Sequence, residues 1–111
     1  MIAKRPSIFI YTFQPDSRIV KEICAGIEEN GVFFEVFEKE SPDLEQLGFE
    51  AARDSMMGTG IGICRDAVLL QMKGLPRHRY VESWKQPTAD VCRRVGANSA
   101  RAIKKLPLIT V

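Results

Sequence analysis

Two apolar runs lie only two residues apart in the middle of the chain, and this short link limits the possible folds more than any other feature. The first run is Gly58–Cys64, the second is Ala67–Met72, and Arg65-Asp66 separates them. Both runs are rich in aliphatic and β-branched residues, which predicts strands. A parallel crossover needs about a dozen residues, so these two strands must be antiparallel neighbours.

The chain before this hairpin alternates between strand-like and helix-like segments. Residues 7–13 and 32–37 are β-branched and aromatic runs, and each predicts a strand. Between them, apolar residues recur every four positions, which predicts a helix from Asp16 or Ser17 to Asn30-Gly31. A second helix is expected to open at Ser41-Pro42, with Pro42 at its first position, where the missing N–H costs nothing.

Two further elements follow the hairpin. Residues 79–84 predict a short fifth strand, and residues 88–106 predict a third helix that Pro107 stops and Gly96 weakens. Alternation followed by a hairpin predicts an α/β fold, a three-layer sandwich with a mixed, roughly five-stranded sheet.

Length and charge exclude several classes of protein. At 111 residues the chain predicts a single domain over 1–111, too short for the two halves of a dinucleotide-binding fold. Its 16 basic and 14 acidic side chains give a net charge of +2, which argues against a nucleic-acid partner. The apolar run 8–13 is too short to span a membrane, so we expect a soluble cytoplasmic protein.

The glycines at 58, 60 and 62 invite comparison with a phosphate-binding loop. The G-x-G-x-x-G pattern would need glycine at position 63, which is Ile63, and no G-K-[ST] sequence occurs. Here the strand also follows the glycines, whereas a phosphate loop follows a strand. We therefore expect these glycines to let another part of the backbone approach closely.

The cysteines and the single histidine form no recognisable catalytic or metal pattern. Cys24, Cys64 and Cys92 are widely spaced, which is typical of small buried residues in a reducing compartment. His78 lies between Arg77 and Arg79 near a loop, and we expect it to be exposed and solvated. An independent small enzyme that uses Cys64 or His78 is the weakest of the hypotheses that remain open.

Two carboxylates occupy an unfavourable position at the end of the first predicted helix. Glu28 and Glu29 fall in its last turn, where the partial negative charge of the helix end disfavours acidic side chains. They are either tolerated surface residues or an acidic corner that meets a cation, such as a partner's Arg or Lys or a Mg²⁺ ion. Basic residues are spread over two elements among glutamates, which favours a solvated surface first, an acidic protein partner second and nucleic acid third. They are Arg77, Arg79, Arg93, Arg94, Arg101, Lys104 and Lys105.

Four motifs occur in an order and spacing that resemble one family. They are Gly26-Ile-Glu-Glu-Asn-Gly31, Thr59-Gly-Ile-Gly-Ile-Cys-Arg-Asp66, Lys73-Gly-Leu-Pro76, and Gly96-Ala-Asn-Ser-Ala-Arg101 followed by Lys104-Lys-Leu-Pro107. From about Ile8 to Leu108 the chain resembles the small subunit of the reactivating factor for adenosylcobalamin-dependent diol and glycerol dehydratases. That subunit is in turn related to the medium (β) subunit of the dehydratase. The last helix departs from the family, which more often has two asparagines and two alanines where this chain has residues 97–100.

The resemblance implies an anticodon-binding-domain-like fold and a non-catalytic role with no cofactor of its own. The family's small subunit pairs with a large, chaperone-like ATPase subunit, which carries ATP or ADP, in an α₂β₂ assembly. This reactivase binds inactivated dehydratase, in which the small subunit displaces a related subunit, and promotes release of damaged cobalamin. The resemblance also implies that Glu29 contacts a Mg²⁺ ion at the interface with the large subunit.

The sequence is also compatible with other roles, substrates and locations. The alternative is a dehydratase β-subunit-like structural subunit that contacts cobalamin, although such subunits normally carry extra segments. The sequence is equally compatible with a diol dehydratase and a glycerol dehydratase as the enzyme that is reactivated. It is also compatible with a location in the free cytoplasm or in a bacterial microcompartment. For a partner interface of about 800 Å² per side, we expect the glycine-rich third-strand region and the ends of the first helix to supply part of the surface.

Overall fold

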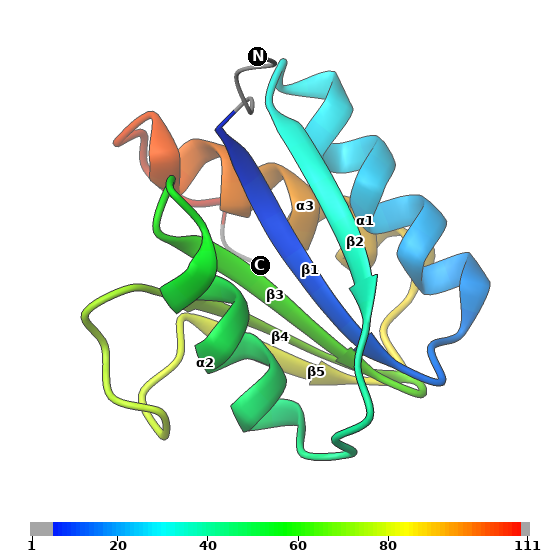
Figure 1. Ribbon diagram of the computed structural model, residues 1–111. Coiled ribbons are helices and arrows are strands. Elements are labelled where there is room, and N and C mark those ends of the chain that lie inside the picture. The colour runs from blue at the N-terminus through cyan, green and yellow to red at the C-terminus, as the bar shows by residue number, and fades with distance from the viewer. Residues whose placement is uncertain (1–5, 110–111) are drawn as a thin grey trace, which may run out of the picture.

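The structure is a computed structural model that describes residues 6–109, and its elements follow the predicted order (Figure 1). The expected single domain over 1–111 includes residues 1–5 and 110–111, which lie outside the described part. The strands are β1 Ser7–Phe13, β2 Phe33–Glu38, β3 Thr59–Cys64, β4 Ala67–Met72 and β5 Glu82–Lys85. The helices are α1 Ser17–Glu29, α2 Leu44–Asp54 and α3 Ala89–Ile103.

The strands form one mixed sheet in the order β2-β1-β3-β4-β5. β1 pairs in parallel with both β2 and β3, whereas β3–β4 and β4–β5 are antiparallel. The two-residue link acts as predicted: Cys64 lies opposite Ala67, and Arg65 takes a positive φ of 56° to make the turn. The sheet is therefore parallel on one side of β3 and antiparallel on the other.

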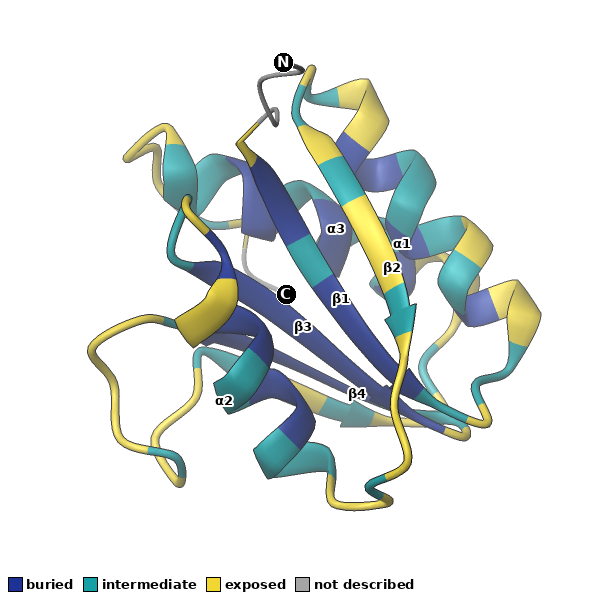
Figure 2. Ribbon diagram, in the orientation of Figure 1, coloured by how far each residue is buried: buried dark blue, intermediate teal, exposed yellow. Residues whose placement is uncertain are grey.

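The helices complete the three-layer sandwich that the sequence predicted. On one face, α1 and α3 enclose the main apolar core with the even-numbered residues of β1, among them Ile8 and Ile10. On the other face, Leu47 and Ala51 of α2 pack with Tyr11 of β1 in a smaller apolar cluster. Figure 2 shows that β1, β3 and β4 are buried, whereas β2 is mostly exposed. Among the described residues, no helix is long and apolar enough to cross a membrane.

The glycines of β3 bring α2 close to the sheet, as expected. A Cβ atom on Gly62 would lie 2.7 Å from the amide nitrogen of Gly48 in α2, and one on Gly60 would collide with the backbone at Ala51 and Ala52. Real Cβ atoms do not approach backbone atoms so closely, so any larger residue would push α2 outward. Gly60 and Gly62 therefore allow the close approach of α2 to the sheet.

Several predicted boundaries were wrong, for local reasons. The second helix does not open at Ser41-Pro42, because the Asp43 side chain accepts the Gln46 amide N–H and makes Leu44 the first helical residue. The third helix ends at Ile103 and not at Leu106, because Lys105 takes a positive φ of 57°. The fifth strand spans 82–85 and not 79–84, because Glu82–Lys85 is the segment that pairs with β4. The second strand begins one residue later than predicted, because the Val32 N–H is bonded to the Ile27 carbonyl at the helix end.

Candidate functional site

The acidic corner singled out by the sequence lies at the C-terminal end of α1. Glu28 and Glu29 are both exposed in its last turn, which carries no basic residue. The helix end is capped from two directions: Asn30 Nδ2 donates to the Gly26 carbonyl at 2.8 Å, and Lys104 Nζ donates to the Asn30 carbonyl. Lys104 thus offsets part of the negative charge that the helix end and the two glutamates create.

A second cation reaches this corner from α3. Arg93 Nη1 lies 3.2 Å from Glu29 Oε1, and its Nη2 lies 2.7 Å from Glu22 Oε2. Glu22 and Glu29 are two helical turns apart on the same side of α1, so one guanidinium can bridge them. The two carboxylates raise the pKa of Arg93. The cation that meets the acidic corner is therefore supplied by the chain itself, and not only by a partner or a metal ion as the sequence suggested.

The surroundings of Glu29 limit what metal it could bind. Its side chain is 59% exposed, and the described residues contain no cluster of three or more side chains able to hold a metal ion. Mg²⁺ takes six oxygen ligands but often only one or two protein carboxylates, with water and partner groups supplying the others. Glu29 fits the role of a single ligand to an ion held mainly by another chain, provided that Arg93 releases it.

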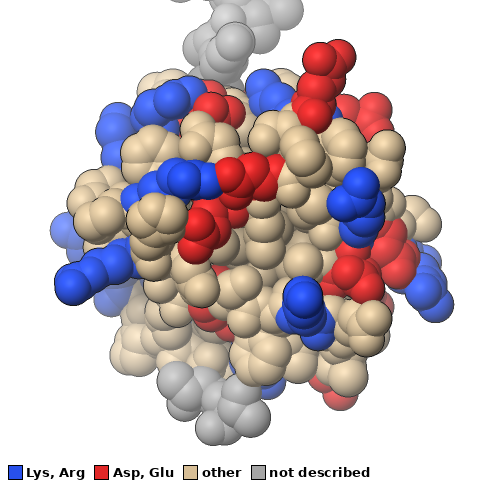
Figure 3. All heavy atoms as spheres, turned by 90° about the horizontal axis from the view of Figure 1, so that it is seen from below, with Lys and Arg blue, Asp and Glu red and all other residues tan. Residues whose placement is uncertain are grey.

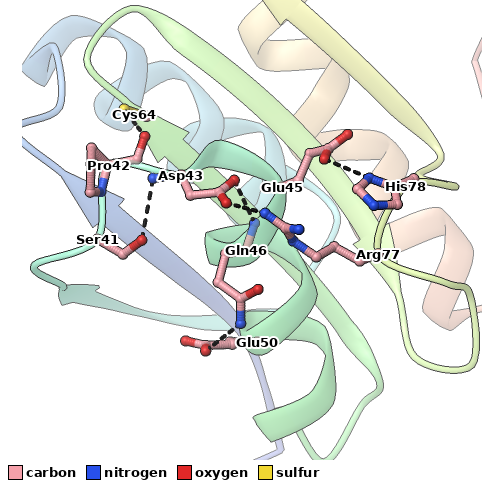
Figure 4. Close-up of polar contacts among 9 residues, drawn as sticks. All are labelled: Ser41, Pro42, Asp43, Glu45, Gln46, Glu50, Cys64, Arg77 and His78. Carbon is pink, nitrogen blue, oxygen red and sulfur yellow. Dashed lines mark hydrogen bonds and ion pairs between the residues drawn. The ribbon is translucent and has the colours of Figure 1, made fainter.

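Cys64 and His78 do not come together. The Cys64 thiol donates to the Pro42 carbonyl at 3.2 Å, whereas His78 Nδ1 lies 2.8 Å from Glu45 Oε1. Figure 4 shows the two side chains on opposite sides of the Asp43–Arg77 ion pair. His78 is exposed, as expected, but it is paired with Glu45 across 33 residues of sequence. This geometry gives no support to a cysteine–histidine nucleophile.

The other two cysteines lie in apolar surroundings that suppress the thiolate. Burial and the nearby Glu28 carboxylate raise the pKa of Cys24 to about 11. Burial also raises the pKa of Cys92, as do Glu22 and Asp16 to a smaller extent. Cys64 and Cys92 are buried and Cys24 is half-buried, which agrees with the expected role as small apolar residues.

A hollow of about 440 Å³ opens where the loops after β1, β3 and β5 meet. Asp16, Glu22 and Asp66 contribute carboxylates to its wall. Two of these already have partners, because Asp16 is bonded to Arg18 and Glu22 to Arg93. The hollow therefore offers no set of uncommitted carboxylates to a metal ion.

Many basic side chains in the described part of the chain, residues 6–109, are paired with other groups of the chain. Most of those noted in the sequence have partners within the chain: Arg77 with Asp43, Arg93 with Glu22 and Glu29, Arg94 over the ring of Trp84, Arg101 with the Pro107 carbonyl, and Lys104 with the Asn30 carbonyl. On the face seen in Figure 3, basic and acidic side chains alternate among uncharged ones. A protein partner suits such a mixed surface better than a polyanion.

Only part of the surface expected to contact a partner is exposed. β3 itself is buried along its whole length between β1 and β4, so within the glycine-rich third-strand region only residues that flank the strand, such as the exposed Arg65, are available to a partner. The C-terminal end of α1 is exposed, as the expected interface requires. A further exposed surface lies on the edge strand β2, where Phe33 and Val36 are exposed, and no local sequence signal marks it.

Comparison with known proteins identifies the family. The sequence model of the dehydratase medium subunit matches residues 5–109. The chain belongs to the dehydratase medium subunit family. This member is 29% identical over 103 residues to the propanediol dehydratase-reactivating factor small subunit of Citrobacter freundii, an alignment that covers 92% of this chain and 89% of that one. It is 26% identical to the diol dehydratase-reactivating factor small subunit of Klebsiella michiganensis, over 92% of this chain and 82% of the relative.

Solved structures within the same group share the fold. A diol dehydratase-reactivating factor complexed with ADP and Mg²⁺ contains a chain that superposes on this family member with a TM-score of 0.88 at 25% identity, covering 96% of this chain and all of that one. A glycerol dehydratase reactivase chain gives a TM-score of 0.90 at 27% identity, over 96% and 98% of the two chains. The resemblance to reactivase small subunits that the four motifs predicted is confirmed.

Proposed function

We propose that this chain is the non-catalytic small subunit of a reactivase for adenosylcobalamin-dependent diol or glycerol dehydratase. The main support for the proposal is the length over which this chain aligns with reactivase small subunits. The chain aligns with reactivase small subunits over nearly their whole length and superposes on 98% of the glycerol dehydratase reactivase chain. Over this aligned length the chain corresponds to a reactivase small subunit.

The chemistry of the described residues supports an accessory role. Cys64 and His78 have separate partners, and the pKa values of the Cys24 and Cys92 thiols are raised, which disfavours nucleophilic catalysis. In this proposal the ATPase site belongs to a large partner subunit in an α₂β₂ assembly. One solved relative of this chain is described as complexed with ADP and Mg²⁺, which agrees with a nucleotide site in such an assembly.

The proposed mechanism is an exchange of subunits. The family includes dehydratase medium subunits, so this chain and a dehydratase subunit share a fold and can present similar surfaces. A domain of this size that binds in place of such a subunit opens the damaged enzyme without chemistry of its own. Release of the damaged cobalamin follows from that opening, and the large subunit uses ATP to reset the complex.

The acidic corner is proposed to lie at the contact with the large subunit. Glu29 would supply one oxygen to a Mg²⁺ ion that the large subunit mainly holds, and the ion would offset the charge at the end of α1. Arg93 holds Glu29 in the free chain at 3.2 Å. The same carboxylate can thus exchange an internal cation for a shared one when the subunits meet.

The proposal is tested by co-expressing the chain with a large reactivase subunit and adding inactivated dehydratase. We expect the two subunits to co-purify and to restore activity in the presence of ATP, Mg²⁺ and fresh adenosylcobalamin. Failure to bind both the large subunit and the dehydratase would refute it. The alternative, a cobalamin-contacting dehydratase subunit, is supported only by membership of the dehydratase medium subunit family. A cobalamin titration of the isolated chain separates the two, since only this alternative predicts binding.

A further inference from the structure

The two edges of the sheet differ in how well they are protected. β5 is four residues long and ends in the exposed Lys85, and short charged strands resist pairing with other chains. β2 spans six residues, Phe-Phe-Glu-Val-Phe-Glu, with neither proline nor lysine. An edge strand of this kind is a template for another strand.

Apolar side chains are exposed on both faces of β2. Val36 lies opposite Ile10 in the sheet register and so shares the face covered by α1 and α3, yet it is 41% exposed. Phe33, Glu35 and Phe37 are alternate residues of β2 and so lie on the same face, the one that carries α2. Phe33 is 51% exposed. A helix laid on either face would cover only one of these side chains. A strand added beside β2 would place side chains next to both.

The acidic residues of β2 indicate which strand fits. Glu35 and Glu38 are exposed and lie on opposite faces of the strand, and β2 carries no basic residue. Pairing of β2 with a second copy of itself would bring four carboxylates onto two adjacent strands, which like-charge repulsion disfavours. A strand with Lys or Arg on both of its faces would be attracted instead.

We propose that the outer edge of β2 pairs with a strand of the large subunit that carries basic residues beside Glu35 and Glu38. The identity of this partner rests on the proposed function, whereas the site and its chemistry rest on β2 itself. Pairing through backbone hydrogen bonds suits a subunit that must bind and leave, because it places few demands on individual side chains.

Hydrogen exchange measured on the complex with the large subunit tests the pairing directly. The amides of an edge strand that point outward alternate along the chain, so we expect about half of those in 33–38 to gain protection when the complex forms. The amides of 82–85, on the opposite edge, serve as the internal control and are expected to keep their exchange rates.

A charge variant provides a second measurement. Glu35→Lys changes an exposed side chain, so circular dichroism should show an unchanged fold, while the dissociation constant for the large subunit should rise about tenfold or more. The matched control is Asp90→Lys, an equal charge change at an exposed position of α3, for which we expect less than about a twofold effect.

The outcomes separate this inference from the proposed function. One outcome is that the complex forms without any change in the amide exchange of residues 33–38, and that Glu35→Lys binds the large subunit as tightly as the unmodified chain. In that case the proposed pairing is wrong and the proposed function stands. If the chain binds neither the large subunit nor dehydratase, both fail. If the isolated chain dimerises in sedimentation experiments and Val36→Lys abolishes the dimer, the edge serves a second copy and the inference is also overturned.

Discussion

Gly26 of α1 and Gly96 of α3 each lie directly against the backbone of the opposite helix. A Cβ atom on Gly26 would collide with the Arg93 carbonyl oxygen, and one on Gly96 would collide with the Ile23 carbonyl oxygen. The sequence suggested only that Gly96 weakens its helix. In the structure, this glycine pair sets how closely the two helices of one layer approach, and it thereby places Arg93 beside Glu22 and Glu29.

The first prediction concerns this crossing. Gly96→Ala should lower the free energy of unfolding by about 2–3 kcal/mol, because the added methyl group meets rigid backbone and forces the helices apart. Urea denaturation measures the change. Gly48→Ala is the matched control: its added methyl group meets the end of the flexible Leu69 side chain, so a smaller loss is expected. Equal losses in the two variants would contradict this account of the crossing.

The second prediction concerns Glu29 and the proposed Mg²⁺ contact. Glu29→Ala should weaken assembly with the large subunit in Mg²⁺ and have little effect in its absence, as measured by calorimetry in both buffers. Arg93→Gln should reduce the Mg²⁺ concentration needed for assembly, because it removes the cation that holds Glu29 in the free chain. Glu28→Ala is the control for simple loss of charge. A Glu29→Ala affinity equal to that of the unmodified chain in both buffers would exclude the metal contact.

The third prediction concerns the pairing of Tyr11 with Asp54. The Tyr11 hydroxyl donates to Asp54 Oδ2 at 2.6 Å, and Arg53 Nε lies 2.9 Å from Asp54 Oδ1. The hydrogen bond from Arg53 makes the larger contribution to holding the pKa of Asp54 below its usual value, and the hydrogen bond from Tyr11 makes a smaller one. Tyr11→Phe should raise that pKa in an NMR titration and lower the free energy of unfolding by about 1 kcal/mol at neutral pH.

The pH dependence of this effect has a definite sign. A carboxyl group with a lowered pKa stabilises the fold above its ordinary pKa, and that contribution is lost as the pH falls through the lowered value. The stability difference between Tyr11→Phe and the unmodified chain should therefore shrink in acid. A difference that stays constant at every pH would mean that Tyr11 acts through packing alone.

The fourth prediction concerns the segment that follows α3. Asn98 is only 2% exposed: its Oδ1 accepts the Ile109 N–H at 2.6 Å, and its Nδ2 donates to the Ile109 carbonyl at 3.0 Å and to Glu82 Oε2 at 2.9 Å. Asn98→Ala should lower the free energy of unfolding by about 1–3 kcal/mol and speed amide exchange at Leu108 and Ile109. Arg101→Ala, which removes a single exposed bond to Pro107, should have a smaller effect. Unchanged exchange at Ile109 in Asn98→Ala would show that other contacts hold the segment.

Errors in the predicted element boundaries arose where a side chain or a distant strand competed with local preference. Pro42 is well suited to the first position of a helix, but Asp43 caps the helix and moves its start to Leu44. Residues 79–81 have the composition of a strand, but the register with β4 leaves them in the preceding loop. Neither outcome depends on the segment alone, so neither was available from local composition.

The unusual placement of Glu28 and Glu29 was visible in the sequence, but its explanation was not. Arg93 is 64 residues from Glu29 along the chain, and only the glycine crossing of α1 and α3 brings them together. The edge position of β2 was hidden for a similar reason. Its apolar composition predicted a strand but could not show that the strand lies outermost with both faces partly exposed.

By itself the sequence determined the order of the elements, the antiparallel hairpin at Arg65-Asp66 and the packing role of the β3 glycines. Each of these depends on residues close together in the chain and on the geometry of a short link. The tertiary structure alone decided the strand order, the edge left open at β2 and the cation that meets Glu29. These depend on which segments pack together across the core, where contacts between residues far apart in sequence outweigh the preferences of each segment.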